Sequence, residues 1–117
     1  NWFRKDGDGK FIWPGFGENM RVLSWIVGRV AGTAEAVESP LGLMPRHADL
    51  NWTGLDFAQA DFSGIMDIER DAGQAEAEEQ KQFFAGFAAH LPGAMERQRQ
   101  TLAAALDAAP ETWRVEG

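Results

Sequence analysis

The sequence predicts an α+β fold in which an N-terminal β-hairpin precedes a mostly α-helical remainder. Three observations support this class. Two short runs of aromatic and β-branched residues flank an Asp-Gly pair near the N-terminus. Apolar residues then recur at helical spacing from residue 18 onward. In the second half, helix-capping signals and further apolar stripes indicate three more helices.

The predicted hairpin pairs residues 2–5 with residues 10–13 of the stretch WFRKDGDGKFIW. Asp8-Gly9 suits a tight turn because both positions can adopt positive φ. A two-stranded hairpin is marginally stable by itself, and its edges can pair with another chain. We therefore expect the chain to self-associate or to pack its hairpin against a neighbour.

A helix is predicted next, over residues 18–32, with Gly32 as its stop. Apolar residues spaced i, i+3, i+4 and i+7 predict one buried stripe on this helix. The stripe consists of Leu23, Ile26, Val27 and Val30. Residues 33–55 are rich in turn formers and are predicted to form a long connection that lies over other elements.

Residues 56–117 are predicted to form a helical tail. Asp56 with Gln59 is a capping signal for a helix to about residue 68, and Asp71 with Gln74 repeats it for a helix to about residue 90. A last helix begins at Pro92 and ends before Pro110. The apolar stripes expected on the last two helices are Phe84, Phe87, Ala88 and Leu91, and Met95, Leu102 and Leu106.

Length and composition exclude several classes of protein. A chain of 117 residues fits one domain, and the absence of cysteine excludes disulfides and thiolate metal sites. No apolar run of about 18 residues predicts a membrane span. Residues 1–31 carry five basic and three acidic side chains, whereas residues 32–117 carry six and fifteen. The acidic part should repel nucleic acid and anionic lipid, so an anionic ligand belongs near the first 31 residues.

The sequence contains no complete motif for binding a metal ion or a phosphate group. The DGDG stretch resembles the start of a calcium loop, but Lys10 stands where a third Asp or Asn is needed. GFGEN lacks both the spacer and the Gly-Lys-Ser/Thr ending of a phosphate-binding loop. His47 and His90 have no surrounding carboxylate cluster, so we interpret them as surface or helix-end histidines.

The aromatic stretch KFIWPGFGEN, residues 10–19, permits two interpretations. One is a local core in which Trp2, Trp13 and Trp25 pack together. The other is a stacking platform for a planar ligand. Gly15 and Gly17 would let the backbone approach such a ligand, and the Asn19 amide offers the donor and acceptor that a purine edge needs.

Residues 1–26, NWFRKDGDGKFIWPGFGENMRVLSWI, resemble the nucleotide-base segment of GTP-dependent phosphoenolpyruvate carboxykinases. The string from Trp13 to Leu23 is close to diagnostic of that family. The resemblance continues through SPLGLMPRHADLNWTGLD, residues 39–56, and extends more weakly to the end of the chain. Met20 departs from the serine that is common at its position.

The resemblance implies a cytoplasmic lyase of gluconeogenesis that converts oxaloacetate and GTP to phosphoenolpyruvate, GDP and carbon dioxide. It also implies manganese at the active site and magnesium with the nucleotide. In the family, phenylalanines enclose the guanine and an asparagine reads its edge. The nucleotide-binding residues that the resemblance assigns here are Phe3, Phe11, Phe16, Gly17 and Asn19.

The same resemblance implies that residues 1–117 are the C-terminal portion of the nucleotide-binding domain of a larger α/β enzyme. Residues 1–31 would form the guanine pocket, 32–55 a connecting segment and 56–117 a helical tail, with no catalytic residue or metal ligand present. A chain that enters a strand pattern directly at Asn1 agrees with a fragment. The alternative is an independent acidic helical interaction module whose aromatic hairpin docks a protein partner.

Overall fold

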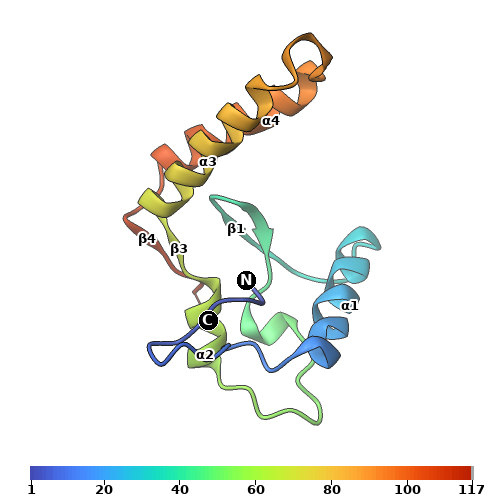
Figure 1. Ribbon diagram of the computed structural model, residues 1–117. Helices are drawn as coiled ribbons and strands as arrows, with labels where there is room; N and C mark the ends of the chain where they lie inside the picture. Colours follow the sequence, from blue (N-terminus) through green and yellow to red (C-terminus); the bar gives the residue numbers. More distant parts are fainter. Residues whose placement is uncertain (117) are drawn as a thin grey trace. The chain divides into compact units, whose positions relative to one another are not determined.

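The computed structural model describes residues 1–116, which form two compact units. Unit 1 contains residues 1–38, residues 43–67 and the segment from residue 114 onward, and unit 2 contains residues 39–42 and 68–113. About half of the described residues are helical, and two small antiparallel sheets of two strands each complete the structure (Figure 1). The α+β class is therefore confirmed.

The predicted N-terminal hairpin is reduced to one antiparallel bridge, between Lys5 and Phe11. On either side of it, the amide of Ile12 donates to the carbonyl of Arg4 over 3.0 Å, and a second bond of 2.9 Å joins the amide of Asp6 to the carbonyl of Lys10. The strands predicted over residues 2–5 and 10–13 do not form, so the order with a hairpin first is not confirmed.

The turn also differs from the prediction. One carboxylate oxygen of Asp6 accepts hydrogen bonds from the amides of Asp8 and Lys10, both over 2.9 Å. These bonds hold a three-residue loop, Gly7 to Gly9, in which only Gly9 has positive φ, at 79°. A loop of three residues with its last glycine at positive φ replaces the two-residue Asp8-Gly9 turn.

The first helix forms where it was predicted. A 3-10 turn, η1 (Phe16–Glu18), leads into α1 (Asn19–Val30). Gly32, at a φ of 73°, ends the helix as predicted.

The stripe of α1 is not buried, which corrects the prediction. Its four side chains are 43–87% exposed within the described chain. Polar groups of α1 do contact the rest of its unit. The guanidinium of Arg21 donates to the carbonyl oxygens of Asn51 and Thr53, and the indole of Trp25 donates to the carbonyl of Glu35 over 2.9 Å.

An aromatic cluster forms the core of unit 1. Trp13 is 5% exposed, and its ring centroid lies 6.4 Å from Trp2, 6.3 Å from Trp52 and 5.8 Å from Phe57. The expected packing of Trp2 on Trp13 is thus confirmed, whereas Trp25 lies outside the cluster. The other buried residues of this unit are Pro45, Leu50, Phe62, Ile65, Met66 and Val115.

Two short elements support this cluster. Helix α2 (Gln59–Met66) supplies three of the buried residues, and its N-cap is Ala58, so the predicted cap at Asp56 is wrong. The 3-10 helix η2 (His47–Asp49) places His47 against Trp52, with ring centroids 5.0 Å apart. Between α1 and η2, strands β1 (Val37–Ser39) and β2 (Gly42–Met44) form a small hairpin inside the segment predicted to be a long connection.

Unit 2 is built on a helical hairpin. Helices α3 (Arg70–Ala85) and α4 (Gly93–Asp107) lie side by side (Figure 1). The sequence predicted both helices, but α3 ends at Gly86 and the 3-10 helix η3 (Ala88–His90) follows. The N-cap of α3 is Glu69 rather than the predicted Asp71.

The packing of unit 2 agrees with the predicted stripes at Leu106 and departs from them elsewhere. Ala77 of α3 and Leu106 of α4 are its buried helical residues, whereas Phe87 and Met95 are about half exposed. Strands β3 (Ile68–Glu69) and β4 (Thr112–Trp113) pair in antiparallel at the base of the hairpin, with Ile68 opposite Trp113. No sequence pattern predicted these two-residue strands.

Candidate functional site

A cavity of about 220 Å³ in unit 1 brings together most of the residues predicted to bind a nucleotide base. Four of the five predicted residues line it, and Gly17 does not. The lining residues are Trp2, Phe3, Phe11, Trp13, Gly15, Phe16 and Asn19. Cavities for drug-sized ligands measure roughly 300–1,000 Å³, so this one suits one end of a nucleotide rather than a whole nucleotide.

The three phenylalanine rings of the cavity are exposed to solvent. Phe3 is 76% exposed, Phe11 51% and Phe16 91%. Phe3 and Phe11 meet edge to face, with centroids 6.3 Å apart. Burying one such side chain is worth about 1.5–3 kcal/mol, so three exposed rings around one cavity favour a flat apolar ligand there.

Asn19 is held by the buried tryptophan of the core. The indole Nε1 of Trp13 donates to the amide oxygen Oδ1 of Asn19 over 2.8 Å. Asn19 is the first residue of α1, and the N-cap of this helix is Glu18. The amide oxygen is therefore engaged by protein, whereas the amide nitrogen donates to no protein group within residues 1–116.

The backbone around Gly15 explains how the loop reaches this arrangement. Gly15 has a φ of 142° and a ψ of 176°, a region that is open in practice only to glycine. It separates the buried Trp13 from the exposed Phe16 and precedes η1, which leads into the first turn of α1. Gly17 lies inside η1 and does not have a positive φ. Its backbone conformation therefore does not require glycine.

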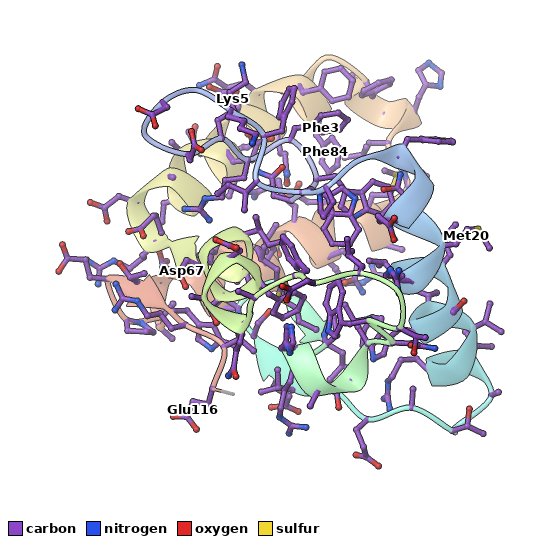
Figure 2. All side chains as sticks on the ribbon, turned by 90° about the horizontal axis from the view of Figure 1, so that it is seen from below. Phe3, Lys5, Met20, Asp67, Phe84 and Glu116 are labelled. Atoms are coloured by element: carbon purple, nitrogen blue, oxygen red, sulfur yellow. The ribbon has the colours of Figure 1, made fainter. Side chains whose placement is uncertain are left out.

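Positive charge lies beside the aromatic wall. The ammonium of Lys5 sits 5.1 Å from the centroid of Phe11, a cation–π contact. Arg21, two residues after Asn19, is already paired with Glu18 over 2.6 Å and with backbone carbonyls. Met20 is 63% exposed, extends outward from α1 (Figure 2) and does not line the cavity.

The two histidines differ. His90 is exposed at the end of η3, as predicted. His47 is half-buried, and its Nε2 forms a hydrogen bond of 2.9 Å with the carbonyl of Phe57. It begins η2, which agrees with the helix-end interpretation, and it packs in the aromatic cluster rather than lying on the open surface.

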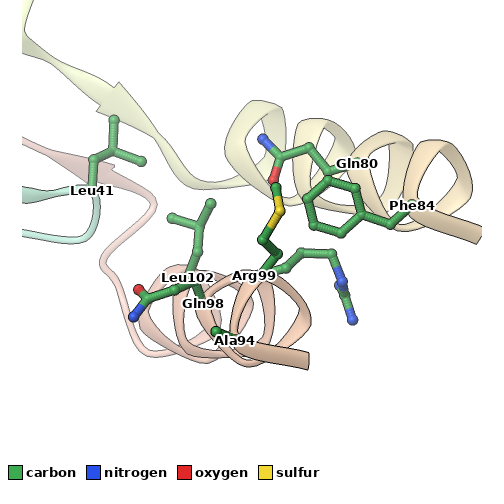
Figure 3. Close-up of a pocket in the computed structure, with 8 residues that line it drawn as sticks. Leu41, Gln80, Phe84, Ala94, Gln98, Arg99 and Leu102 are labelled. Atoms are coloured by element: carbon green, nitrogen blue, oxygen red, sulfur yellow. The ribbon is translucent and has the colours of Figure 1, made fainter. Parts of the chain in front are cut away.

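A larger cavity, of about 530 Å³, lies in unit 2 (Figure 3). Gln80 and Phe84 of α3 line it from one side, and Ala94, Gln98 and Leu102 of α4 from the other. It holds one aromatic ring and none of the predicted site residues. We therefore do not assign the nucleotide base to this larger cavity.

The guanidinium at the edge of that cavity is already neutralised. Arg99 donates to both carboxylate oxygens of Glu96, over 2.9 and 2.6 Å. These hydrogen bonds from Arg99 lower the pKa of Glu96 to about 2, and Glu96 in turn raises the pKa of Arg99. A cation paired in this way attracts an anionic ligand weakly.

Two further properties constrain the chemistry of the described chain. Among residues 1–116, no three His, Asp or Glu side chains gather as a metal-binding group. Over the same residues, the longest helices are too short or too polar to cross a membrane.

The chain is similar to GTP-dependent phosphoenolpyruvate carboxykinases. Its residues 1–105 match the family model described as the phosphoenolpyruvate carboxykinase C-terminal P-loop domain. It is 39% identical over 102 residues to the phosphoenolpyruvate carboxykinase [GTP] of Arthrobacter sp. (strain FB24), and 42% identical over 110 residues to that of Neocallimastix frontalis. It is also 42% identical over 99 residues to the cytosolic [GTP] enzyme of Gallus gallus.

These matches cover most of this chain but a small part of the relatives. They include 87%, 93% and 84% of the chain, in the order above, and 17%, 18% and 16% of the relatives' own lengths. The chain therefore spans less than a fifth of the length of the curated relatives it matches.

Proposed function

Because this chain belongs to the GTP-dependent phosphoenolpyruvate carboxykinase family, in its C-terminal P-loop domain, we propose that it forms the guanine-binding part of such an enzyme. The enzyme converts oxaloacetate and GTP to phosphoenolpyruvate, GDP and carbon dioxide in the cytoplasm. The single observation that carries the proposal is the cavity in which Phe3, Phe11, Phe16 and Asn19 meet.

The physical chemistry of the cavity supports a nucleobase. Stacking of a base on aromatic side chains contributes about 1–3 kcal/mol and depends little on which base is present. The phenylalanine rings can supply this affinity because they are exposed. Selectivity for guanine then requires a polar group that reads the base edge, and Asn19 is the amide that lines the cavity.

Gly17 takes a lesser role in this proposal than the sequence suggested. Its backbone belongs to η1, and the residue does not line the cavity. We assign close approach of the backbone to the base to Gly15 instead, which lines the cavity and has the conformation that requires glycine.

The phosphate and metal chemistry is assigned to other parts of the enzyme. Within residues 1–116 no three His, Asp or Glu side chains gather to hold manganese or magnesium, Lys5 lies over a phenylalanine ring, and Arg21 is paired with Glu18. In this proposal the chain holds the base end of GTP, while oxaloacetate, the triphosphate and the metal ions are bound elsewhere.

The alternative, an independent acidic interaction module with an aromatic docking hairpin, is not supported by the comparisons. The expected self-association of the chain stays a prediction.

A titration of GTP and ATP tests the proposal, using a full-length carboxykinase that carries this segment. Since base stacking alone does not distinguish purines, edge reading in the cavity predicts a lower dissociation constant for GTP. Competition between GTP and ATP for one site serves as the control. Equal dissociation constants for the two nucleotides would contradict a guanine-reading site.

A further inference from the structure

The hydrogen bond between Trp13 and Asn19 determines which end of the Asn19 amide is available to a ligand. An indole N–H can only donate, so the amide atom 2.8 Å from Trp13 Nε1 must be the oxygen. The free end of the amide is then the nitrogen, which carries two donors and no acceptor. The orientation follows from the chemistry of the indole and not from how the amide atoms are assigned.

The indole is itself fixed in place. Trp13 is 5% exposed, stacks on Trp2 and meets Trp52 and Phe57 edge to face. Rotation of the indole would break these contacts. The Nε1–H group therefore keeps one direction, and Asn19 Oδ1 keeps its partner before any ligand arrives.

We propose that Trp13 is a positioning residue for base selectivity, which leaves the amide nitrogen of Asn19, a hydrogen-bond donor, as the end available to the ligand. This proposal rests on the proposed function. A donor matches the 6-oxo group of guanine, which accepts hydrogen bonds, and opposes the 6-amino group of adenine, which donates them. Without the indole N–H, the amide can turn and offer its oxygen to adenine.

Four purine nucleotides can show which position of the base the Asn19 amide contacts. Hypoxanthine has the 6-oxo group of guanine but lacks its 2-amino group, whereas 2,6-diaminopurine has the 2-amino group and a 6-amino group. An amide that donates to the 6-position should group ITP with GTP, and 2,6-diaminopurine riboside triphosphate with ATP. An amide that reads the 2-amino group would instead group GTP with the diaminopurine nucleotide, and ITP with ATP.

The test is Trp13→Phe in a full-length carboxykinase that carries this segment, because phenylalanine keeps an aromatic ring and removes the donor. Dissociation constants for GTP and ITP should rise about three- to tenfold, the effect of one hydrogen bond. Those for ATP and the diaminopurine nucleotide should stay the same or fall, because the released amide can offer its oxygen to their 6-amino groups. In an Asn19→Ala background, Trp13→Phe should not change the ratio of GTP to ATP affinity any further.

Trp52→Phe is the matched control. It removes an indole N–H of the same aromatic cluster, one that donates to the carbonyl of His47 over 2.8 Å and does not touch Asn19. It should leave the ratio of GTP to ATP affinity unchanged. An equal loss for all four nucleotides in Trp13→Phe would overturn the inference, because it would show a purely structural role. So would a loss for GTP without one for ITP.

The same variants separate this inference from the proposed function. If Asn19→Ala lowers GTP and ATP affinity equally, edge reading by Asn19 is wrong and the proposed function fails with it. If Asn19→Ala is selective for GTP while Trp13→Phe changes no nucleotide, only the positioning role of Trp13 is wrong.

Discussion

Gly73 of α3 packs directly against Leu106 of α4. A Cβ atom placed on Gly73 would lie 2.6 Å from Cδ2 of Leu106, closer than carbon atoms can approach. Leu106 is 1% exposed, so its side chain has little room to move away. The two helices of unit 2 can therefore approach each other at this point only because residue 73 has no side chain.

Gly73→Ala should destabilise the chain. Overpacking a buried contact costs about 1–3 kcal/mol, which exceeds the gain of up to about 1 kcal/mol from replacing a helical glycine. We expect a net loss of roughly 1–2 kcal/mol in the free energy of unfolding, measured by urea denaturation. Gly64→Ala is the matched control, because a Cβ on this glycine of α2 meets nothing within 4 Å. A stabilised Gly73→Ala variant would contradict the packing.

Gly15→Ala and Gly17→Ala should differ in their effect on stability and GTP affinity, although only Phe16 separates the two glycines. Neither Cβ would meet an atom within 4 Å, so only backbone conformation distinguishes them. At Gly15, with a φ of 142°, alanine should cost about 1–3 kcal/mol of stability and displace Phe16 from the cavity. At Gly17 the cost should be below about 0.5 kcal/mol. Urea denaturation and GTP affinity measure both effects, and equal losses would refute the distinction.

Acid should weaken the Glu96–Arg99 pair. The pKa of Glu96 falls from an ordinary 4.5 to about 2 in the folded chain, chiefly through hydrogen bonds from Arg99. Because the folded-state pKa is lowered, the stabilisation is fully present above about pH 4.5 and disappears as the pH falls toward 2. The pair lies at the surface of α4, so we expect a small effect.

Glu96→Gln tests this pH dependence, because glutamine does not ionise. The free energy of unfolding of the unsubstituted chain should fall more steeply between pH 4.5 and pH 2 than that of the variant. Above pH 4.5 the free energies of unfolding of the two chains should change with pH in parallel. Parallel curves throughout would show that the pair does not contribute.

The 117-residue chain alone should not turn over oxaloacetate. Within the described residues there is no group of three potential metal ligands, and the proposed base cavity contacts only one end of a nucleotide. Association costs at least about 4 kcal/mol, so base stacking without phosphate contacts should give a GTP dissociation constant no lower than about millimolar. An assay with oxaloacetate, GTP and manganese checks this, and turnover above a blank without protein would refute it.

The sequence predicted those features that depend on local pattern. The position of α1 and its end at Gly32 followed from periodicity and from a glycine stop, and both agree with the structure. The gathering of Phe3, Phe11 and Phe16 followed from a family resemblance. By contrast, the apolar stripe on α1 indicated the helix but not its exposure, because burial depends on what packs against it.

Features that depend on distant pairing had no local signal. Strands β3 and β4 contain two residues each and pair segments more than 40 residues apart along the chain. The hydrogen bond from Trp13 to Asn19 joins two residues that Pro14, Gly15 and η1 separate along the chain. It depends on how the aromatic cluster orients the indole of Trp13. No spacing of residues along the chain predicts such a bond. The proposed role of Asn19 as a donor therefore rests on a hydrogen bond that the sequence did not predict.

The most direct test of the guanine site compares Asn19→Ala with Phe16→Ala in a full-length carboxykinase that carries this segment. Phe16→Ala should weaken GTP and ATP by similar factors, because stacking is insensitive to the base. Asn19→Ala should leave buried edge groups of guanine unpaired, at about 1–3 kcal/mol, and so weaken GTP roughly five- to 150-fold and ATP less. The measurement is the GTP and ATP dissociation constants of both variants. Equal losses of GTP and ATP affinity in Asn19→Ala would contradict the guanine site.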